Sequence, residues 1–351
     1  MKPNKPITTL VAGLGRIGWE YHIAAAAKNP HFAVTAGVDI VSERRRECEE
    51  VYGCRTFETI DEALAANVAE LAVIATRSID HCEHAVKALE AGCHVFVDKP
   101  AAMNLAEMDR MIDAARRNKR VLTVNQSLRA HKDVRFIREV IDSGVLGKVF
   151  WIKRGFAGSF YRRNDWQMEK RYGGGAYNNP GVHLTDAVLQ LADAPVHDVW
   201  GDLKRTGASA GDADDFARVS IRTEDGRLIE FATTYTTAFG EPEWLICGNC
   251  GSMQIESHKS TTARLKYFDP AKAPKRELEG PVPAGREYRI PEELPWVEEE
   301  VAIEPKKPYP DWYDNLYETI RNGATPNVTA ESARETIRVM DEARKASIWK
   351  Y

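Results

Sequence analysis

Hydrophobic and polar positions alternate regularly along the first third of the chain. Short, nearly uninterrupted apolar runs are separated by longer segments whose apolar residues recur at helical spacing. Such short runs are typical of strands buried on both faces of a parallel sheet, and such longer segments are typical of the helices that connect them. We therefore expect a doubly wound α/β fold with strands at 7–12, 32–38, 71–75, 94–97 and 121–124.

Polar residues and glycines mark the ends of the intervening helices. Ser42, Asp80 and Asn104 are expected helix N-caps, because their side chains can accept hydrogen bonds from the first turn. Gly53 and Gly92 are expected stops, because glycine readily takes the left-handed conformation that ends a helix.

The rhythm changes after about residue 125. Helices are expected at 132–143 and 181–192. A series of strand-like runs follows the second helix, and the hairpin signal Asp225-Gly226 joins two of these runs. Two helices, 311–322 and 329–348, close the chain, and 269–307 reads as a long surface excursion. This predicts a first domain at 1–125 and an α+β domain at 126–351, with an open, largely antiparallel sheet and helices on one face. Its strands are expected at 148–156, 198–205, 216–222, 228–237, 243–247, 252–257 and 263–268.

Composition narrows the function classes. The 351 residues include 48 basic and 52 acidic side chains, for a formal net charge of −4, so nucleic acid is not an expected partner. The chain has no uninterrupted apolar run of roughly 18 residues, and we expect a cytoplasmic protein with no membrane span. Cys247 and Cys250 have the spacing of half a zinc site or of a redox motif, but a hairpin turn at Gly248-Asn249 is favoured, and no metal is expected.

A glycine motif follows the first expected strand and opens a helix. In Gly13-Leu-Gly15-Arg-Ile-Gly18 the first glycine allows a tight turn, the second lets a pyrophosphate approach the backbone, and the third lets helix and strand pack closely. Asp39 ends the second strand, where a carboxylate accepts hydrogen bonds from the adenosine ribose. NAD is therefore favoured over NADP, although Arg44 and its two neighbouring arginines could accommodate a 2′-phosphate; they could equally form a solvated helix face.

Two further segments carry candidate chemistry. Val97-Asp98-Lys99-Pro100 places a lysine at the carboxyl end of a parallel strand, the edge where such sheets bind ligands. Farther along, a glycine-rich stretch leads into a segment that, if helical, puts Asn179, His183 and Asp186 on one face.

Together with the glycine motif, these segments resemble the Gfo/Idh/MocA family of nicotinamide-dependent oxidoreductases, over nearly the whole chain. The resemblance implies a Rossmann domain, a bound NAD and a lysine and histidine that serve the chemistry, here Lys99 and His183. Asn179 stands where the family usually has a carboxylate, which puts the usual carboxylate–histidine proton relay in doubt. The cofactor contacts it implies are Gly13, Gly15, Arg16, Ile17, Gly18, Asp39, Ile40, Arg44, Thr76, His81, Lys99 and Gln126.

The expected reaction is hydride transfer from a secondary carbinol to the nicotinamide. His183 would take the hydroxyl proton as general base, Lys99 would stabilise alkoxide character, and Asn179 would orient a substrate hydroxyl. Asp186 would bind substrate or fix the imidazole tautomer. Without the resemblance, a lone histidine on a helix would be read as a packing or surface residue.

An arginine-rich and aromatic run precedes the glycine-rich stretch. Arg163, Asp165 and Trp166 are candidate substrate residues, because polar groups grip sugar hydroxyls and an aromatic ring stacks on the C–H face; packing at an interface or in a loop is the alternative. Gln126 and Arg129 are weaker substrate candidates.

The expected function is therefore an NAD-dependent dehydrogenase of a sugar, glycoside or inositol-like polyol, acting at a ring hydroxyl such as C3. The balanced charge favours mostly uncharged polyols. A glycosidase that retains NAD and uses transient oxidation, or a non-catalytic regulator resembling the galactose repressor relatives, are the alternatives. We expect a homodimer or homotetramer formed through the C-terminal sheet.

Overall fold

The computed structural model describes residues 5–156, 159–275 and 293–350. Its first sheet has six parallel strands in the order β3-β2-β1-β4-β5-β6, which is the doubly wound arrangement expected from the apolar runs. The strands are β1 (Ile7–Ala12), β2 (Phe32–Val38), β3 (Arg55–Phe57), β4 (Leu71–Ile74), β5 (His94–Asp98) and β6 (Leu122–Asn125).

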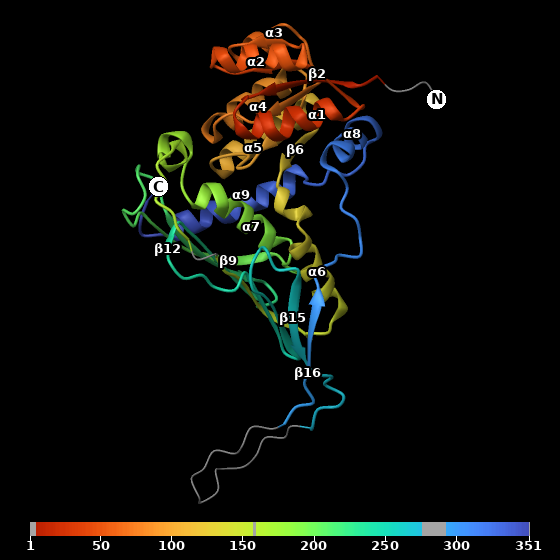
Figure 1. Ribbon diagram of the computed structural model, residues 1–351, viewed down its shortest axis with the longest axis vertical. Helices are drawn as coiled ribbons and strands as arrows, with labels where there is room; N and C mark the ends of the chain where they lie inside the picture. Colours follow the sequence, from red (N-terminus) through yellow and green to blue (C-terminus); the bar gives the residue numbers. More distant parts are fainter. Residues whose placement is uncertain (1–4, 157–158, 276–292, 351) are drawn as a thin grey trace, which may run out of the picture.

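Helices cover both faces of this sheet (Figure 1). Asn104 caps α5 through the N–H of Glu107, and Gly53 ends α2 in the left-handed conformation, as expected. The expected cap at Ser42 is wrong, because Ser42 is the first residue of α2. Asp80 does occupy the N-cap position of α4, but its side chain accepts no capping bond. The helices are α1 (Ala24–Lys28), α2 (Ser42–Tyr52), α3 (Ile60–Ala65), α4 (His81–Glu90) and α5 (Leu105–Asn118), with a π-helical turn η1 (Gly18–Ile23) after the glycine motif.

The second sheet has eight strands in the order β16-β15-β14-β13-β7-β11-β10-β9, with a single parallel pair, β7 with β11. The hairpin at Asp225-Gly226 joins β10 to β11, and the stretch containing Cys247 and Cys250 is a β-hairpin with both thiols free. The strands are β7 (Val149–Arg154), β9 (Val196–Lys204), β10 (Phe216–Thr223), β11 (Leu228–Thr234), β13 (Trp244–Gly248), β14 (Gly251–Ile255), β15 (Thr262–Tyr267) and β16 (Val297–Ala302); β8 (Ser159–Phe160) and β12 (Thr236–Thr237) form a separate pair.

Strand β16 corrects the expectation that 269–307 is only a surface excursion. It pairs with β15 along its full length and is the outer strand of the sheet. The part of the excursion at 276–292 lies outside the described residues.

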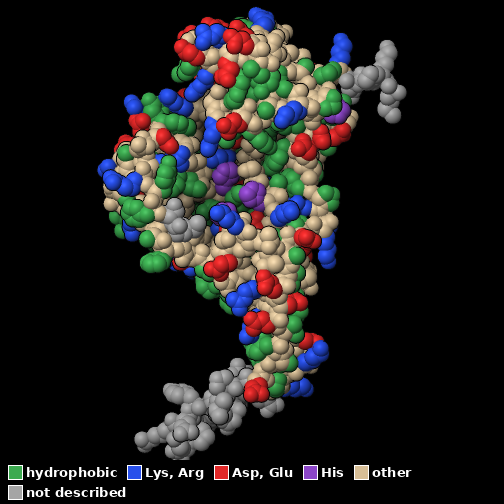
Figure 2. Space-filling model, viewed as in Figure 1, with side chains coloured by type: hydrophobic (Ala, Val, Ile, Leu, Met, Phe, Trp, Pro, Cys, Tyr) green, Lys and Arg blue, Asp and Glu red, His purple; other side chains and the backbone are tan. Residues whose placement is uncertain are grey.

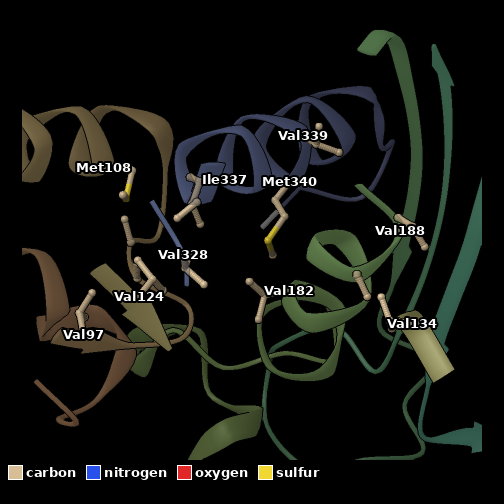
Figure 3. Packing of buried hydrophobic residues seen from close by; sticks show 14 of the residues in the cluster. Val97, Met108, Val124, Val134, Val182, Val188, Val328, Ile337, Val339 and Met340 are labelled. Atoms are coloured by element: carbon tan, nitrogen blue, oxygen red, sulfur yellow. The ribbon is translucent and has the colours of Figure 1, made fainter. Parts of the chain in front are cut away.

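Helices α6 (Lys132–Ser143), α7 (Val182–Leu189) and α9 (Ala330–Ala346) lie between the large sheet and the N-terminal domain (Figure 1). Gly201 of β9 lets α9 pack closely, because a Cβ there would lie 2.3 Å from the carbonyl oxygen of Ala343. Figure 3 shows the resulting continuous core, in which Met108 and Val124 of the first domain approach Ile337 of α9, and Met340 approaches Val182 of α7.

Helix α8 (Trp312–Asn322) crosses back to the first domain. Its side chains Tyr313, Leu316 and Tyr317 belong to one buried cluster with Ile7 and Phe96 of the parallel sheet. Thr329 then forms a bridge with Thr123 of β6 before α9 begins. The last helices therefore join the two domains as well as ending the chain.

Candidate active site

A hollow with histidine, lysine and arginine side chains on its walls lies between the upper and lower parts of the molecule (Figure 2). On one side are the carboxyl ends of the parallel strands, including Lys99 directly after β5. On the other side is the segment that leads into α7, with Asn179 and His183. The hollow therefore brings together residues that are far apart in the sequence.

The glycine motif has the conformation that its spacing predicts. Gly13 has a φ of +90°, and a Cβ there would lie 2.4 Å from the carbonyl oxygen of Ala75. A Cβ on Gly18 would lie 1.7 Å from the carbonyl oxygen of Gly13, so the turn and the helix can only pack with glycine at both positions. A Cβ on Gly15 would meet only the tip of Arg44 at 4.0 Å, which leaves the backbone open to a ligand, and Arg16 and Ile17 beside it are exposed.

Asp39 lies at the end of β2 beside this turn. Its carboxylate accepts the N–H of Leu14 at 2.8 Å and the N–H of Val41 at 2.9 Å, so it also fixes the glycine turn against β2. Arg44 lies 3.3 Å from the same carboxylate and Ile40 is 73% exposed. The expected ribose site is thus an acidic group with an exposed apolar residue and a cation around it.

Three further expected cofactor residues line the neighbouring strand ends. Thr76 follows β4, and its carbonyl oxygen lies 3.1 Å from Nε2 of His81, whose Nδ1 lies 2.8 Å from the carbonyl oxygen of Pro100. His81 therefore links the loops after β4 and β5 and is itself buried. Gln126, after β6, is 2% exposed and its Oε1 has no hydrogen-bond partner among the described residues. The open glycine turn, the acidic strand end and this unpaired amide together fit a dinucleotide.

Lys99 and Asn179 are in direct contact across the hollow. The Nζ of Lys99 donates to Oδ1 of Asn179 at 2.9 Å and approaches its carbonyl oxygen at 3.3 Å. Burial lowers the pKa of Lys99, the charge of Asp98 raises it, and the charges of Arg16 and Arg163 lower it further. The ammonium is thus held in a place where its charge is poorly solvated.

His183 is poorly solvated, like Lys99. Burial first, and then the positive charge of Lys99, lower the pKa of His183 to about 3, while Asp98 opposes the change and His131 adds to it. The imidazole is therefore neutral at pH 7 and able to accept a proton. Its Nδ1 is buried and has no hydrogen-bond partner among the described residues.

Asp98 supplies the negative charge under Lys99. Burial would raise the pKa of Asp98, but His22, whose Nε2 lies 4.0 Å from Oδ1, and then Lys99 lower it to about 2. Asn125 of β6 also donates to this carboxylate at 3.0 Å. Asp98 is therefore ionised at neutral pH.

The carboxylate of Asp186 bonds to residues other than His183. It is fully buried, with one oxygen 2.8 Å from Nε of Arg129 and the other 2.6 Å from Nη2. Thr336 of α9 donates to it at 3.0 Å. A buried carboxylate needs such a counter-charge, so Asp186 and Arg129 are structural.

Arg163 and Asp165 belong to the second domain, and Arg163 lies near Lys99 and Tyr235. Arg163 donates from Nε to Asp165 at 2.9 Å and from Nη1 to the hydroxyl of Tyr235 at 3.2 Å. Trp166 begins the 3₁₀ turn Trp166–Met168 and is 37% exposed. Of the three, Arg163 is the one whose charge acts on Lys99.

Several residues of the site have no sequence motif. Gln167 accepts from Nδ2 of Asn179 at 3.2 Å. Burial raises the pKa of Tyr235, and both Arg163 and Asn179 oppose this, so its phenol lies between them. Asp214 accepts the N–H of Tyr177 at 2.7 Å at the start of the π-helical turn Tyr177–Gly181. Only the adjacent pair of aspartates in the sequence could have drawn attention to Asp214.

Two family descriptions match this chain. Residues 7–126 match "Oxidoreductase family, NAD-binding Rossmann fold", and residues 134–254 match "GFO/IDH/MocA C-terminal domain". The chain belongs to the Gfo/Idh/MocA family of oxidoreductases. This confirms the resemblance, the fold class, the expectation of an oxidoreductase and the choice of NAD.

Relatives with named activities are sugar enzymes. D-glucoside 3-dehydrogenase of Escherichia coli is 26% identical over 55% of this chain and 56% of its own length. A dTDP-3,4-didehydro-2,6-dideoxy-alpha-D-glucose 3-reductase of Streptomyces violaceoruber is 29% identical over 49% of this chain and 51% of its own length. The chain thus matches about half the length of these relatives. A longer match, 91% of this chain and 90% of the relative at 26% identity, is the uncharacterised oxidoreductase YhhX of Escherichia coli.

Solved structures share the whole fold. An NAD-binding protein from Listeria innocua superposes with a TM-score of 0.84 at 24% identity, covering 98% of this chain and 97% of that one. The WlbA dehydrogenase of Bordetella pertussis, solved with NADH and UDP-GlcNAcA, has a TM-score of 0.73 at 20% identity, with 97% of each chain covered.

The described part of the chain has neither a metal-binding cluster nor a membrane-spanning helix. Across residues 5–156, 159–275 and 293–350 no three histidine, cysteine or acidic side chains are grouped to hold a metal ion. Over the same ranges no helix has both the length and the apolar character needed to cross a membrane.

Proposed function

We propose that this protein is an NAD-dependent dehydrogenase that oxidises a ring secondary hydroxyl of a sugar, glycoside or inositol-like polyol. The observation that carries the proposal is the meeting of Lys99, Asn179 and His183 at the carboxyl edge of the parallel sheet, beside the glycine turn. The activities named for two relatives, both at position 3 of a hexose ring, support C3 as the reacting carbon.

His183 is the general base in this proposal. Its imidazole is neutral because burial and Lys99 disfavour the protonated form, so it can take the proton of the reacting hydroxyl at neutral pH. Bound NAD would accept the hydride at its nicotinamide. Nδ1 of His183 is buried, so Nε2 is the nitrogen we assign to the hydroxyl.

Lys99 stabilises the oxygen as it loses its proton. An ammonium held in a poorly solvated place interacts more strongly with a developing negative charge than one in water does. Asn179 fixes Nζ of Lys99 through its side-chain oxygen. An amide can orient Nζ in this way, as the family's usual carboxylate would. The amide takes no proton, so the proton relay runs through His183 and Lys99 alone.

The test replaces Lys99 and His183 singly by alanine. NADH formation is measured with a panel of sugars, glycosides, inositols and sugar acids, and NADH binding by fluorescence. Each variant is expected to lose at least about a hundredfold in kcat, the range of a general base or of one charge-stabilising donor, while NADH binding persists. Unchanged turnover in both variants would refute the assignment.

A second candidate is a lyase or hydratase cycle in which NAD is reduced and re-oxidised within one turnover. Two relatives named 2,7-anhydro-N-acetylneuraminate hydratase, from Mediterraneibacter gnavus and Escherichia coli and each 25% identical, favour it. Product formation without accumulation of NADH would select this cycle over net oxidation.

A further inference from the structure

Arg163 is a cation near the proposed catalytic residues, and neither His183 nor Lys99 requires it for its proposed role. The side chain of Arg163 is 16% exposed and reaches Tyr235, which lies beside Asn179, the partner of Lys99. Arg163 is also one of the charges that lower the pKa of Lys99. It therefore lies close to the place where substrate must sit.

The counter-charge of Arg163 lies on its outer side. Asp165 bonds only to Nε, its side chain is 43% exposed, and one of its oxygens also accepts the N–H of Gln167. Asp165 is not among the groups that shift the pKa of Lys99, whereas Arg163 is. Nη2 of Arg163 has no hydrogen-bond partner among the described residues. Nη1 and Nη2 of Arg163, unlike Nε, therefore have no carboxylate bonded to them among the described residues.

The remaining charges near Lys99 do not supply an anion. Asp98 is the one acidic group that acts on Lys99, and His22 lies against it. Arg16 stands on the glycine turn, where the cofactor phosphates would meet it. Lys99 and Arg163 are linked through Asn179 and Tyr235, and the charge of Arg163 lowers the pKa of Lys99. Two cations this close repel one another, and an anion bound near them would relieve the repulsion.

We propose that the substrate is a sugar or polyol that carries an anionic group, a carboxylate or a phosphate, which Arg163 binds while Lys99 and His183 face the hydroxyl to be oxidised. A planar guanidinium with free Nη donors suits the paired oxygens of either group. This inference rests on the proposed function and replaces the expectation of uncharged polyols with a charged class.

Binding of the anion has a second consequence for Lys99. A negative charge beside Arg163 cancels the repulsion that lowers the pKa of Lys99, so the bound substrate itself favours the ammonium form. For anionic substrates the fall of kcat at alkaline pH should therefore lie at higher pH than it does for neutral ones.

The test compares matched pairs that differ in charge. Glucose and galactose are paired with glucuronic and galacturonic acids, and glucose 6-phosphate represents the phosphate source. The wild-type enzyme is expected to favour an anionic member by at least about tenfold in kcat/KM, because charge-assisted hydrogen bonds are roughly twice as strong as neutral ones. The acid or the phosphate that shows the preference identifies the source of the anion.

Three variants assign the preference to Arg163. Arg163→Gln is expected to raise KM for the anionic member at least about tenfold, the loss of one charged hydrogen bond, with little change for the neutral member. Asp165→Asn keeps the bond to the N–H of Gln167 but removes the competing charge, so it should increase the preference. Arg162→Gln is the matched control, since Arg162 is exposed and bonds only to the carbonyl oxygen of Ala208 among the described residues, and it should leave the preference unchanged.

Binding to the NADH-loaded enzyme keeps the inference separate from the proposed function. Each pair is titrated and the dissociation constants are compared, which requires no turnover. Tighter binding of the acid or phosphate that Arg163→Gln abolishes supports the anionic site even if no sugar is oxidised. Equal binding of charged and neutral members, or an equal loss of both in Arg163→Gln, overturns it.

Discussion

At the scale of single residues, Lys99 acts on the proton affinity of His183. Each is buried, and the positive charge of Lys99 lowers the pKa of His183 to about 3. The family's usual carboxylate would moderate this repulsion, but Asn179 leaves only Asp98 to oppose it. The substitution therefore makes His183 a base that stays neutral in acid, and makes Lys99 an ammonium that loses its proton more easily.

The lowered pKa values of His183 and Lys99 predict the pH profile of the enzyme. For a non-ionising substrate, kcat/KM rises as His183 loses its proton and falls as Lys99 loses its own. Because both pKa values are lowered, we expect the acid limb well below pH 6.5 and the alkaline limb below pH 10.5. Asn179→Asp adds a negative charge beside Nζ and should move both limbs to higher pH. An acid limb near pH 6.5 in the wild type would contradict the proposed environment.

Among the site residues, those within a local motif could be predicted and those fixed by distant contacts could not. Gly13, Gly18 and Lys99 are set by their own turn or strand end. Asp186 shares a helix with His183, but Arg129, 57 positions away, takes its carboxylate. Helical spacing says which residues share a face, and it does not say which face meets a counter-charge from elsewhere.

At the scale of elements, the same limit separates the strands of the parallel sheet from β16, the outer strand of the large sheet. Five strands of the parallel sheet could be predicted because they are largely buried and apolar, whereas the short edge strand β3 is partly exposed and was not predicted. Strand β16 has the sequence Val-Glu-Glu-Glu-Val-Ala and is almost fully exposed. It is held to β15 by backbone pairing and by cross-strand charges such as Glu298 with Arg264 and Lys266, which no hydrophobic pattern reveals.

The pair of Arg129 and Asp186 gives a prediction about element packing. It joins α7 to α9 and to the turn Ser127–Ala130, so Asp186→Asn leaves a buried guanidinium without its counter-charge. We expect a loss of about 3–5 kcal/mol in the free energy of unfolding, measured by urea denaturation.

A surface pair provides the control for this prediction. Asp142→Asn removes a carboxylate that is 62% exposed and bonded to Arg138, and should cost less than about 1 kcal/mol. Equal losses in the two variants would mean that burial of the Arg129 pair contributes nothing. If the Asp186→Asn protein loses activity but keeps wild-type stability, Asp186 has a role in catalysis.

At the scale of the whole molecule, no helix of the described residues covers one face of the large sheet. Trp200 is 50% exposed on β9, and its neighbour across the strand pair is Ser220, which lies between the buried Val219 and Ile221. Alternation along the strand therefore directs Trp200 to the face opposite α9. This is the face through which we expect the homodimer or homotetramer to form.

The assembly prediction is tested by placing a charge on that face. Trp200→Glu should reduce the mass measured by light scattering from a multiple of the 39.4 kDa chain to a single chain. Val51→Glu replaces an exposed apolar residue of the first domain, 59% exposed on α2, and should leave the mass unchanged. An unaltered mass in Trp200→Glu would direct the search to another surface.

The position of helix α8 has a consequence for folding during synthesis. The strands of the parallel sheet are complete once residue 125 has been made, yet Tyr313, Leu316 and Tyr317 fill one side of that sheet's core. During synthesis, an apolar surface of the cofactor-binding domain therefore stays uncovered until α8 has left the ribosome. Synthesis that stops before residue 312 would leave this domain with exposed apolar surface that invites aggregation and chaperone binding.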